Sequence, residues 1–166
     1  MVGVDDEAKE GPLRKLVPGE LDLRVVDVGS NDKEPGSEIL LAGAPTGKIV
    51  TGSFLEGAVA TARGYVLFTT NDVPAEETLA VYYLDTQLGL LDRATIVWPY
   101  ASGQFTGLQL LQPNRLRFNF LRSEPWVLTL LDHRVFRIPL LSDPRGVWRL
   151  SPFRYFELAS TKSRDG

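Results

Sequence analysis

Hydrophobic and polar side chains alternate along several short stretches of this chain. In residues 115–121, Leu116, Phe118 and Phe120 occupy every second position, with arginine or asparagine between them. Residues 21–28 show the same alternation. A period of two places the apolar side chains on one face of a β-strand, so both stretches are predicted to be strands with one buried face.

The rest of the chain also divides into segments of strand length. Fifteen glycines and eleven prolines are spread along it, and they interrupt every stretch of about twelve residues that could carry the apolar spacing of an amphipathic helix. We therefore expect an all-β protein. The predicted strands cover residues 21–28, 38–42, 48–54, 57–62, 64–70, 78–84, 93–98, 104–111, 115–121, 126–131, 134–140, 147–150 and 153–158.

A faint internal repeat refines this prediction. Residues 78–98 and 126–140 both follow the order strand, turn with an aspartate, strand, and a pair of predicted strands precedes each of them. Four strands in about 40–50 residues is the repeat of a β-propeller blade, and a closed propeller has at least about four blades. The chain has room for only three such units. We expect an incomplete β-propeller-like antiparallel meander, with a β-sandwich or an irregular barrel as the alternative.

The two ends of the chain are polar and lack strand patterns. Residues 1–18 are predicted to be a poorly ordered leader. The first residues have neither the basic nor the apolar region of a signal peptide. The leader is therefore either native or acquired with a new start. Residues 19–160 are predicted to form a single all-β domain, and residues 161–166 a flexible tail.

The composition excludes several kinds of chemistry. The 166 residues include no cysteine and one histidine, which excludes disulfides, thiolate metal sites and a cysteine nucleophile. The sequence contains no Gly-rich phosphate loop and no calcium-binding loop motif. We therefore expect no catalytic residues, no metal ion and no cofactor, and a protein that binds rather than reacts.

Charge is distributed unevenly along the chain. The net charge is −3, but residues 92–166 carry eleven basic and six acidic side chains, and ten of the basic ones are arginines. Arginines on strands usually line a solvated sheet face, so we expect these to be exposed rather than to form a nucleic-acid surface. No run of the roughly 18 apolar residues that a membrane helix needs is present. Neither nucleic acid nor a membrane is an expected partner.

One pair of neighbours, Asp132 and His133, suggests acid–base catalysis. They are adjacent in a predicted tight turn, where neighbouring side chains point apart, and no G-x-S-x-G motif supplies a nucleophile. We expect both side chains in solvent. The acidic pairs Asp5–Asp6 and Glu76–Glu77 are likewise expected in solvated loops, because their neighbours would not raise a carboxyl pKa.

The segment between the predicted strands 93–98 and 104–111 has a different composition. Small residues and an amide allow close backbone approach and adaptable hydrogen bonds, while aromatic residues supply rigid contact area. Such a loop can enter a concave protein surface; alternatively, it is an ordinary hairpin whose aromatic residues anchor it to the core. The candidate partner-binding residues are Tyr100, Ala101, Ser102, Gly103, Gln104 and Phe105.

These features resemble the immunity proteins of bacterial type VI secretion peptidoglycan amidases, most closely the Pseudomonas type that guards against a papain-like amidase. The resemblance rests on a small, cysteine-free all-β chain with incomplete blade-like repeats over residues 20–160, and on the loop at 100–105. It implies a periplasmic protein without enzymatic activity that inserts this loop into the Cys–His active-site groove of the toxin. Ser102 would then meet the region of the catalytic histidine, with Gly103 and Gln104 lining the groove.

The resemblance also implies that the partner is a cognate peptidoglycan amidase effector. A periplasmic location would require an export signal that the acidic leader does not supply, and without the resemblance a cytoplasmic location is expected. An alternative function is a carbohydrate- or peptide-binding β module, in which Trp98, Tyr100, Trp126 and Trp148 form a stacking surface. A hydrolase acting through the aspartate–histidine pair is the third hypothesis.

Overall fold

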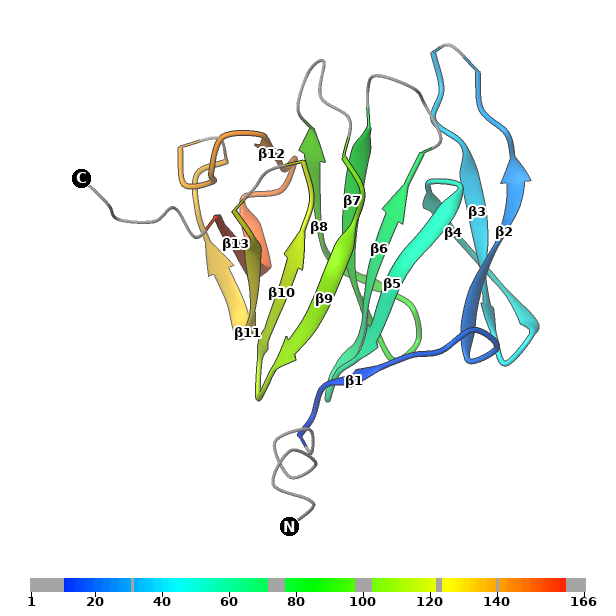
Figure 1. The fold of residues 1–166 in the computed structure, drawn as a ribbon, viewed down its shortest axis with the longest axis horizontal. Helices are drawn as coiled ribbons and strands as arrows, with labels where there is room; N and C mark the ends of the chain where they lie inside the picture. The colour runs from blue at the N-terminus through cyan, green and yellow to red at the C-terminus, as the bar shows by residue number, and fades with distance from the viewer. Residues whose placement is uncertain are drawn as a thin grey trace.

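A computed structural model describes residues 11–30, 32–71, 77–97, 103–121, 124–139 and 141–160 (Figure 1). All regular elements in these ranges are β-strands, and among the described residues no helix is long and apolar enough to cross a membrane. The strands are β1 (Arg14–Lys15), β2 (Leu21–Asp27), β3 (Gly36–Leu41), β4 (Ala44–Thr51), β5 (Phe54–Ala60), β6 (Gly64–Thr70), β7 (Thr78–Asp85), β8 (Leu90–Val97), β9 (Thr106–Leu111), β10 (Arg115–Asn119), β11 (Trp126–Phe136), β12 (Val147–Trp148) and β13 (Phe153–Ser160).

The strands form three antiparallel sheets, which follow one another along the chain except that β1 and β12 join the second of them (Figure 1). The first sheet has the order β2-β3-β4, the second β1-β5-β6-β7-β8-β12 and the third β13-β11-β10-β9. Most neighbours in a sheet are also consecutive in sequence, as in a meander, and none of the described sheets closes into a barrel. The prediction of an all-β antiparallel meander is therefore confirmed.

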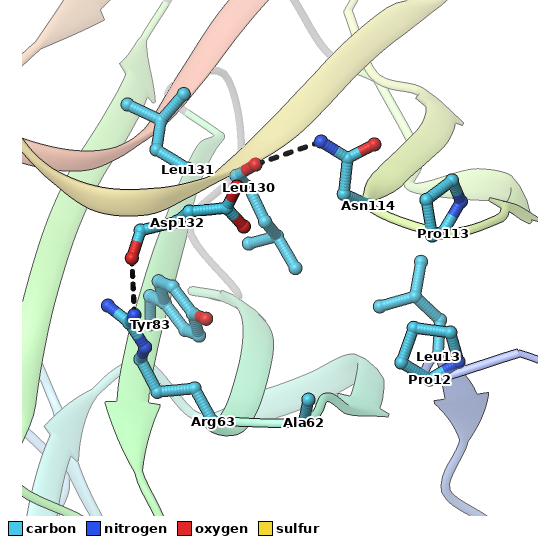
Figure 2. Close-up of a pocket in the computed structure, with 10 residues that line it drawn as sticks. All are labelled: Pro12, Leu13, Ala62, Arg63, Tyr83, Pro113, Asn114, Leu130, Leu131 and Asp132. Carbon is cyan, nitrogen blue, oxygen red and sulfur yellow. Dashed lines mark hydrogen bonds between the residues drawn. The ribbon is translucent and has the colours of Figure 1, made fainter.

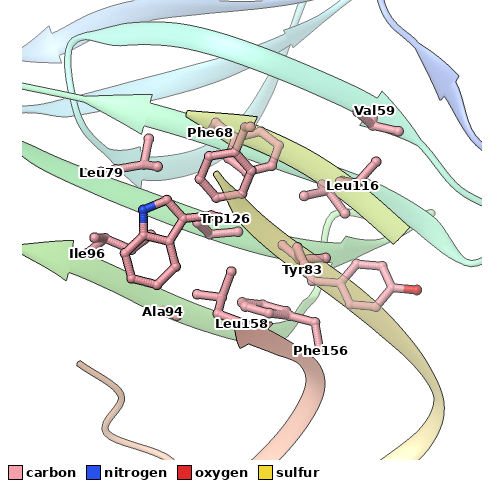
Figure 3. Close-up of a cluster of buried hydrophobic side chains, with 14 of the residues drawn as sticks. Val59, Phe68, Leu79, Tyr83, Ala94, Ile96, Leu116, Trp126, Phe156 and Leu158 are labelled. Carbon is pink, nitrogen blue, oxygen red and sulfur yellow. The ribbon is translucent and has the colours of Figure 1, made fainter. Parts of the chain in front are cut away.

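The six-stranded sheet lies in the middle and is covered on both faces. Along β6, Val66 and Phe68 point into one hydrophobic core, and Leu67 between them points into another. The larger core is shared with the four-stranded sheet, which contributes Trp126 and Leu158 to it (Figure 3). The smaller core is shared with the three-stranded sheet. Because both faces of β6 and β7 are buried, these strands are nearly continuous apolar runs, whereas outer strands such as β10 alternate.

The prediction of a hairpin at Asp132–His133 is wrong. β11 continues through both residues as one strand, and its two halves both pair with β13. The register shifts between Leu130 and Val135, so the extra residues bulge out of the ladder instead of reversing the chain. A polar pair between two apolar runs is compatible with either outcome, and here β13 is long enough to hold both runs in line. The second predicted repeat is thus completed by β13 and not by residues 134–140.

The folded region begins earlier than predicted. Part of the expected leader, residues 11–16, runs along the edge of the molecule, where β1 pairs with β5 and Leu13 is buried. The Leu13 amide N–H donates to Gln112 Oε1 at 3.1 Å, and Gln112 Nε2 donates to the Leu13 carbonyl at 2.8 Å. This N-terminal arm therefore bridges the central sheet and the four-stranded sheet. Residues 1–10 and 161–166 lie outside the described residues.

Candidate functional site

The candidate partner-binding loop connects β8 to β9, which belong to different sheets. β8 ends and β9 begins at the upper end of the molecule in Figure 1, where β6 also ends. Three of the six candidate residues, Tyr100, Ala101 and Ser102, lie outside the described residues. The structure places the other three, which form the base of the loop.

Phe105 anchors this base to the larger core. Its ring is stacked on Phe118 with centroids 5.3 Å apart, and its centroid is 4.9 Å from that of Phe68. Phe68 belongs to the central sheet and Phe118 to the four-stranded sheet, so the ring fills the space between them. For Phe105 the structure thus shows the core-anchoring role that the hairpin interpretation assigned to the aromatic residues of this segment.

Gly103 is held from two sides. Its N–H donates to Glu77 Oε2 at 3.1 Å, and a Cβ atom on this residue would lie 2.8 Å from backbone atoms of Leu121. Such an approach is closer than real Cβ contacts, so a side chain at this position would displace the loop base. Gln104, between Gly103 and Phe105, is exposed. The base of the loop therefore has a defined position and presents the Gln104 side chain to solvent.

A cavity of about 340 Å³ adjoins the loop base. Two carboxylates line it: Glu77, which accepts the Gly103 hydrogen bond, and Glu56, whose Oε1 accepts from Thr70 Oγ1 at 2.6 Å. The base of the loop therefore borders an acidic cavity. Its lining residues are Phe54, Glu56, Thr70, Asn71, Glu77, Gly103, Gln104 and Phe105.

The aromatic surface of the alternative hypothesis is not assembled in the described residues. Trp126 is only 1% exposed and packs in the larger core, and its Nε1–H donates to the Phe120 carbonyl at 3.0 Å. It cannot stack on a ligand. Trp148 is exposed on β12, and Trp98 and Tyr100 lie outside the described ranges. Trp126 is therefore not part of any stacking surface.

The aspartate–histidine pair is exposed, as predicted. Asp132 and His133 both lie on the bulge of β11. Among the residues that the structure describes, no group of three or more potential metal ligands is found. The acidic pair Glu76–Glu77 is divided by the limits of the described residues, and its second member is the one that binds the Gly103 N–H.

Two of the C-terminal arginines are buried, which contradicts the expectation of a purely solvated arginine face. Arg149 Nη1 lies 2.9 Å from Asp92 Oδ2, and Arg149 Nε lies 3.2 Å from Asp143 Oδ1. Arg154 forms a two-pronged pair with Asp143 at 2.8 and 3.2 Å. All four side chains are at most 2% exposed. This charged cluster ties the segment around β12 to β8 and β13.

Asp92 shows how the cluster is stabilised. Burial raises the pKa of its carboxyl above the ordinary value, and the Arg149 guanidinium acts in the opposite direction. The backbone N–H of Tyr155 also donates to Asp92 Oδ2, at 2.7 Å. Because the cluster has no exposed atoms to offer a ligand, we assign it a structural role.

Comparison of the sequence with protein-family models and with curated proteins, and of the fold with solved structures, gave no significant match.

Proposed function

We propose that this chain is a non-enzymatic inhibitor that inserts the loop between β8 and β9 into the active-site groove of a target enzyme. The observation that carries the proposal is the anchored base of the loop. Phe105 is held between two sheets and Gly103 between Glu77 and Leu121. A loop with a positioned base loses less conformational freedom on binding, which is how preorganised binders gain affinity.

The proposed target is a peptidoglycan amidase with a Cys–His active site, as the resemblance implies, and the proposed location is the periplasm. Ser102 would hydrogen-bond near the catalytic histidine, and Gly103 and Gln104 would line the groove. An enzyme of this kind works in a cleft through an activated thiolate. Occupying the cleft and engaging the histidine would block both substrate binding and thiol activation.

The test measures peptidoglycan cleavage by the product of the neighbouring gene, the expected amidase, with and without the inhibitor. Ser102→Arg and deletion of residues 101–104 are expected to abolish inhibition, because each removes the part that enters the groove. Thermal unfolding should stay close to that of the unchanged protein, because both variants keep Phe105, whose ring anchors the base of the loop in the core.

Arg117→Gln is the matched control, because Arg117 is an exposed residue on β10, outside the loop and its anchored base. This variant should inhibit as well as the unchanged protein. Full inhibition by the loop deletion would disprove the proposed mechanism.

A further inference from the structure

A second, larger cavity lies by the β5–β6 and β9–β10 turns, at the end of the sheets opposite the base of the candidate loop (Figure 1), and Figure 2 shows it in close-up. It has a volume of about 550 Å³ and is open to solvent, which is within the usual range of roughly 300–1,000 Å³ for small-molecule sites. The N-terminal arm, the β5–β6 and β9–β10 turns, β7 and the β11 bulge all contribute to it. Its lining residues are Pro12, Leu13, Ala62, Arg63, Tyr83, Pro113, Asn114, Leu130, Leu131 and Asp132.

Two buried leucines and a buried tyrosine form part of the wall of this cavity. Leu13, Tyr83 and Leu130 are 2%, 3% and 7% exposed. Figure 2 shows the Tyr83 hydroxyl directed into the space between these walls. Among the described residues no hydrogen bond to this hydroxyl is found, and its oxygen is not one of the buried unpaired side-chain atoms. The hydroxyl is therefore accessible from the cavity and free to bind a ligand there.

A positive group is fixed at the mouth. Arg63 lies on the β5–β6 turn, where Thr61 Oγ1 accepts the Gly64 N–H at 2.9 Å. Its Nη2 donates to the backbone carbonyl of Asp132, and its guanidinium lies over the Tyr155 ring, 5.3 Å from the centroid. These two contacts orient the planar group and leave other N–H donors for a ligand, which suits a carboxylate.

Two acceptors face the same cavity. The side-chain amide of Asn114 donates through Nδ2 to the Leu130 carbonyl at 3.1 Å, which leaves its Oδ1 as an acceptor. Within the described residues the Asp132 carboxylate has neither a hydrogen-bond nor an ion-pair partner. A carboxylate and an amide oxygen together favour a bound ammonium group.

We propose that this cavity binds a short peptide with free termini and apolar side chains, of two or three residues. The peptide carboxylate pairs with Arg63 and accepts a hydrogen bond from the Tyr83 hydroxyl. The ammonium group of the peptide pairs with the Asp132 carboxylate. Its side chains lie against the apolar wall formed by Leu13 and Leu130. Opposite charges at one mouth distinguish such a zwitterion from a nucleotide or a fatty acid, which would need positive groups alone.

This binding site is independent of the proposed inhibitory loop. The cavity lies at the other end of the sheets (Figures 1 and 2), and none of its lining residues belongs to the loop base. Variants of the cavity are therefore expected to keep the inhibitory activity, so that failure of one proposal is distinguishable from failure of the other.

The test is calorimetric titration of the full chain with L-leucyl-L-leucine, and with the same dipeptide acetylated and amidated at its ends. The free dipeptide should bind saturably with one-to-one stoichiometry, and capping should weaken binding about tenfold or more because both charged contacts are lost. Shifts of the Leu13 and Leu130 methyl resonances would place the ligand in the cavity.

Three variants separate the contacts. Tyr83→Phe removes only a hydroxyl that has no hydrogen-bond partner among the described residues, so it should leave the unfolding temperature unchanged and weaken dipeptide binding about five- to tenfold. Arg63→Gln and Asp132→Asn should each weaken binding about tenfold or more. Arg117→Gln, which removes an exposed arginine elsewhere, should bind like the unchanged protein.

The proposal is overturned by any of three results. These are absence of saturation up to about 10 mM dipeptide, equal affinity for the capped and free dipeptides, or unchanged affinity in Tyr83→Phe.

Discussion

Two aspartates and two arginines form a buried charged cluster in the C-terminal half of the fold. Asp143 pairs with both Arg149 and Arg154, and all three side chains are at most 2% exposed. Within the described part of the chain Arg154 Nε has no hydrogen-bond partner, so the hydrogen-bonding capacity of the cluster is only partly satisfied even with Asp143 in place. Removal of a partner from such a cluster leaves an uncompensated charge away from water.

Asp143→Asn is therefore expected to destabilise the protein by about 3–5 kcal/mol, because it keeps the volume and removes the charge that both arginines share. Urea unfolding followed by tryptophan fluorescence would measure the change. Glu157→Gln is the control: Glu157 pairs with Arg137 at 3.6 Å where both are about half exposed, and the expected change is below about 1 kcal/mol. Equal changes in the two variants would contradict the structural role of the cluster.

Glu38 provides a pH-dependent residue in the first sheet. Its carboxylate accepts hydrogen bonds from Arg24 and, at 2.9 Å, from the Gly47 N–H. The Arg24 hydrogen bond, followed by that of Gly47, lowers the Glu38 pKa below its ordinary value of 4.5. A carboxylate with a lowered pKa stabilises the folded state above its unfolded pKa, and this contribution is lost as pH falls through the folded pKa.

Glu38→Gln is expected to unfold at a lower temperature than the unchanged protein at pH 7. This gap should shrink as pH falls below 4.5, because the native carboxylate then becomes protonated and neutral as well. Thermal unfolding of both proteins between pH 7 and pH 3 checks the sign. A gap that stays constant over this range would show that the charge of Glu38 contributes nothing.

At the scale of elements, one aromatic ring holds the end of the candidate loop and the start of β9 in place. Phe105 precedes β9 and lies between β6 and β10 through its contacts with Phe68 and Phe118. Gly57 of β5 lies beneath the same ring, where an added Cβ would be 3.4 Å from it. The ring therefore joins strands of two sheets at the point where the chain crosses from one to the other.

Phe105→Ala is expected to lower the free energy of unfolding by about 2–3 kcal/mol, somewhat less than for a fully buried phenylalanine because the ring is half-buried. It should also weaken inhibition, since the loop base loses its anchor. Phe105→Leu should recover most of the stability. Denaturant unfolding and the amidase assay would be measured together, and an unaffected stability in Phe105→Ala would show that the ring does not anchor the loop.

At the scale of the whole molecule, the three sheets differ in how much of each is buried. The central sheet has a core on both faces, whereas each outer sheet has one. The core between the central and four-stranded sheets is the larger, and the three-stranded sheet packs on the smaller one. Opening of the three-stranded sheet therefore exposes less apolar surface than opening of the centre.

Amide hydrogens of β6 and β7 are expected to exchange with solvent only through global unfolding, and those of β2, β3 and β4 through an easier local opening. Native-state hydrogen exchange in low denaturant, resolved by NMR, measures both sets of opening free energies. The same opening free energy in all three sheets would indicate that the stack unfolds as one unit.

Sequence patterns predicted most of the strands and failed at β11 for a physical reason. Alternation of apolar side chains depends only on neighbouring positions, so residues 115–121 were recognisable as a one-sided strand without any knowledge of their partners. Whether Asp132 and His133 reverse the chain or bulge from it depends on β13, which pairs across the gap. That partner is distant in sequence and leaves no local signal.

The candidate sites, like the strands, were only partly predictable from the sequence. The composition of the β8–β9 loop drew attention to Gly103 and Phe105, but only the fold shows that Glu77 holds one and two sheets hold the other. The second cavity had no sequence signal, because Arg63, Tyr83 and Asp132 come from separate turns and strands.

By itself, the sequence determined that this protein is an all-β meander without cysteine chemistry, because strand period, turn residues and composition are local properties of the chain. The tertiary structure decided which faces became core, which arginines were buried and where the two cavities formed. These outcomes depend on pairs such as Asp92 and Arg149, which are far apart in sequence and 2.9 Å apart in the fold. Only the packing of sheets on one another brings such groups together.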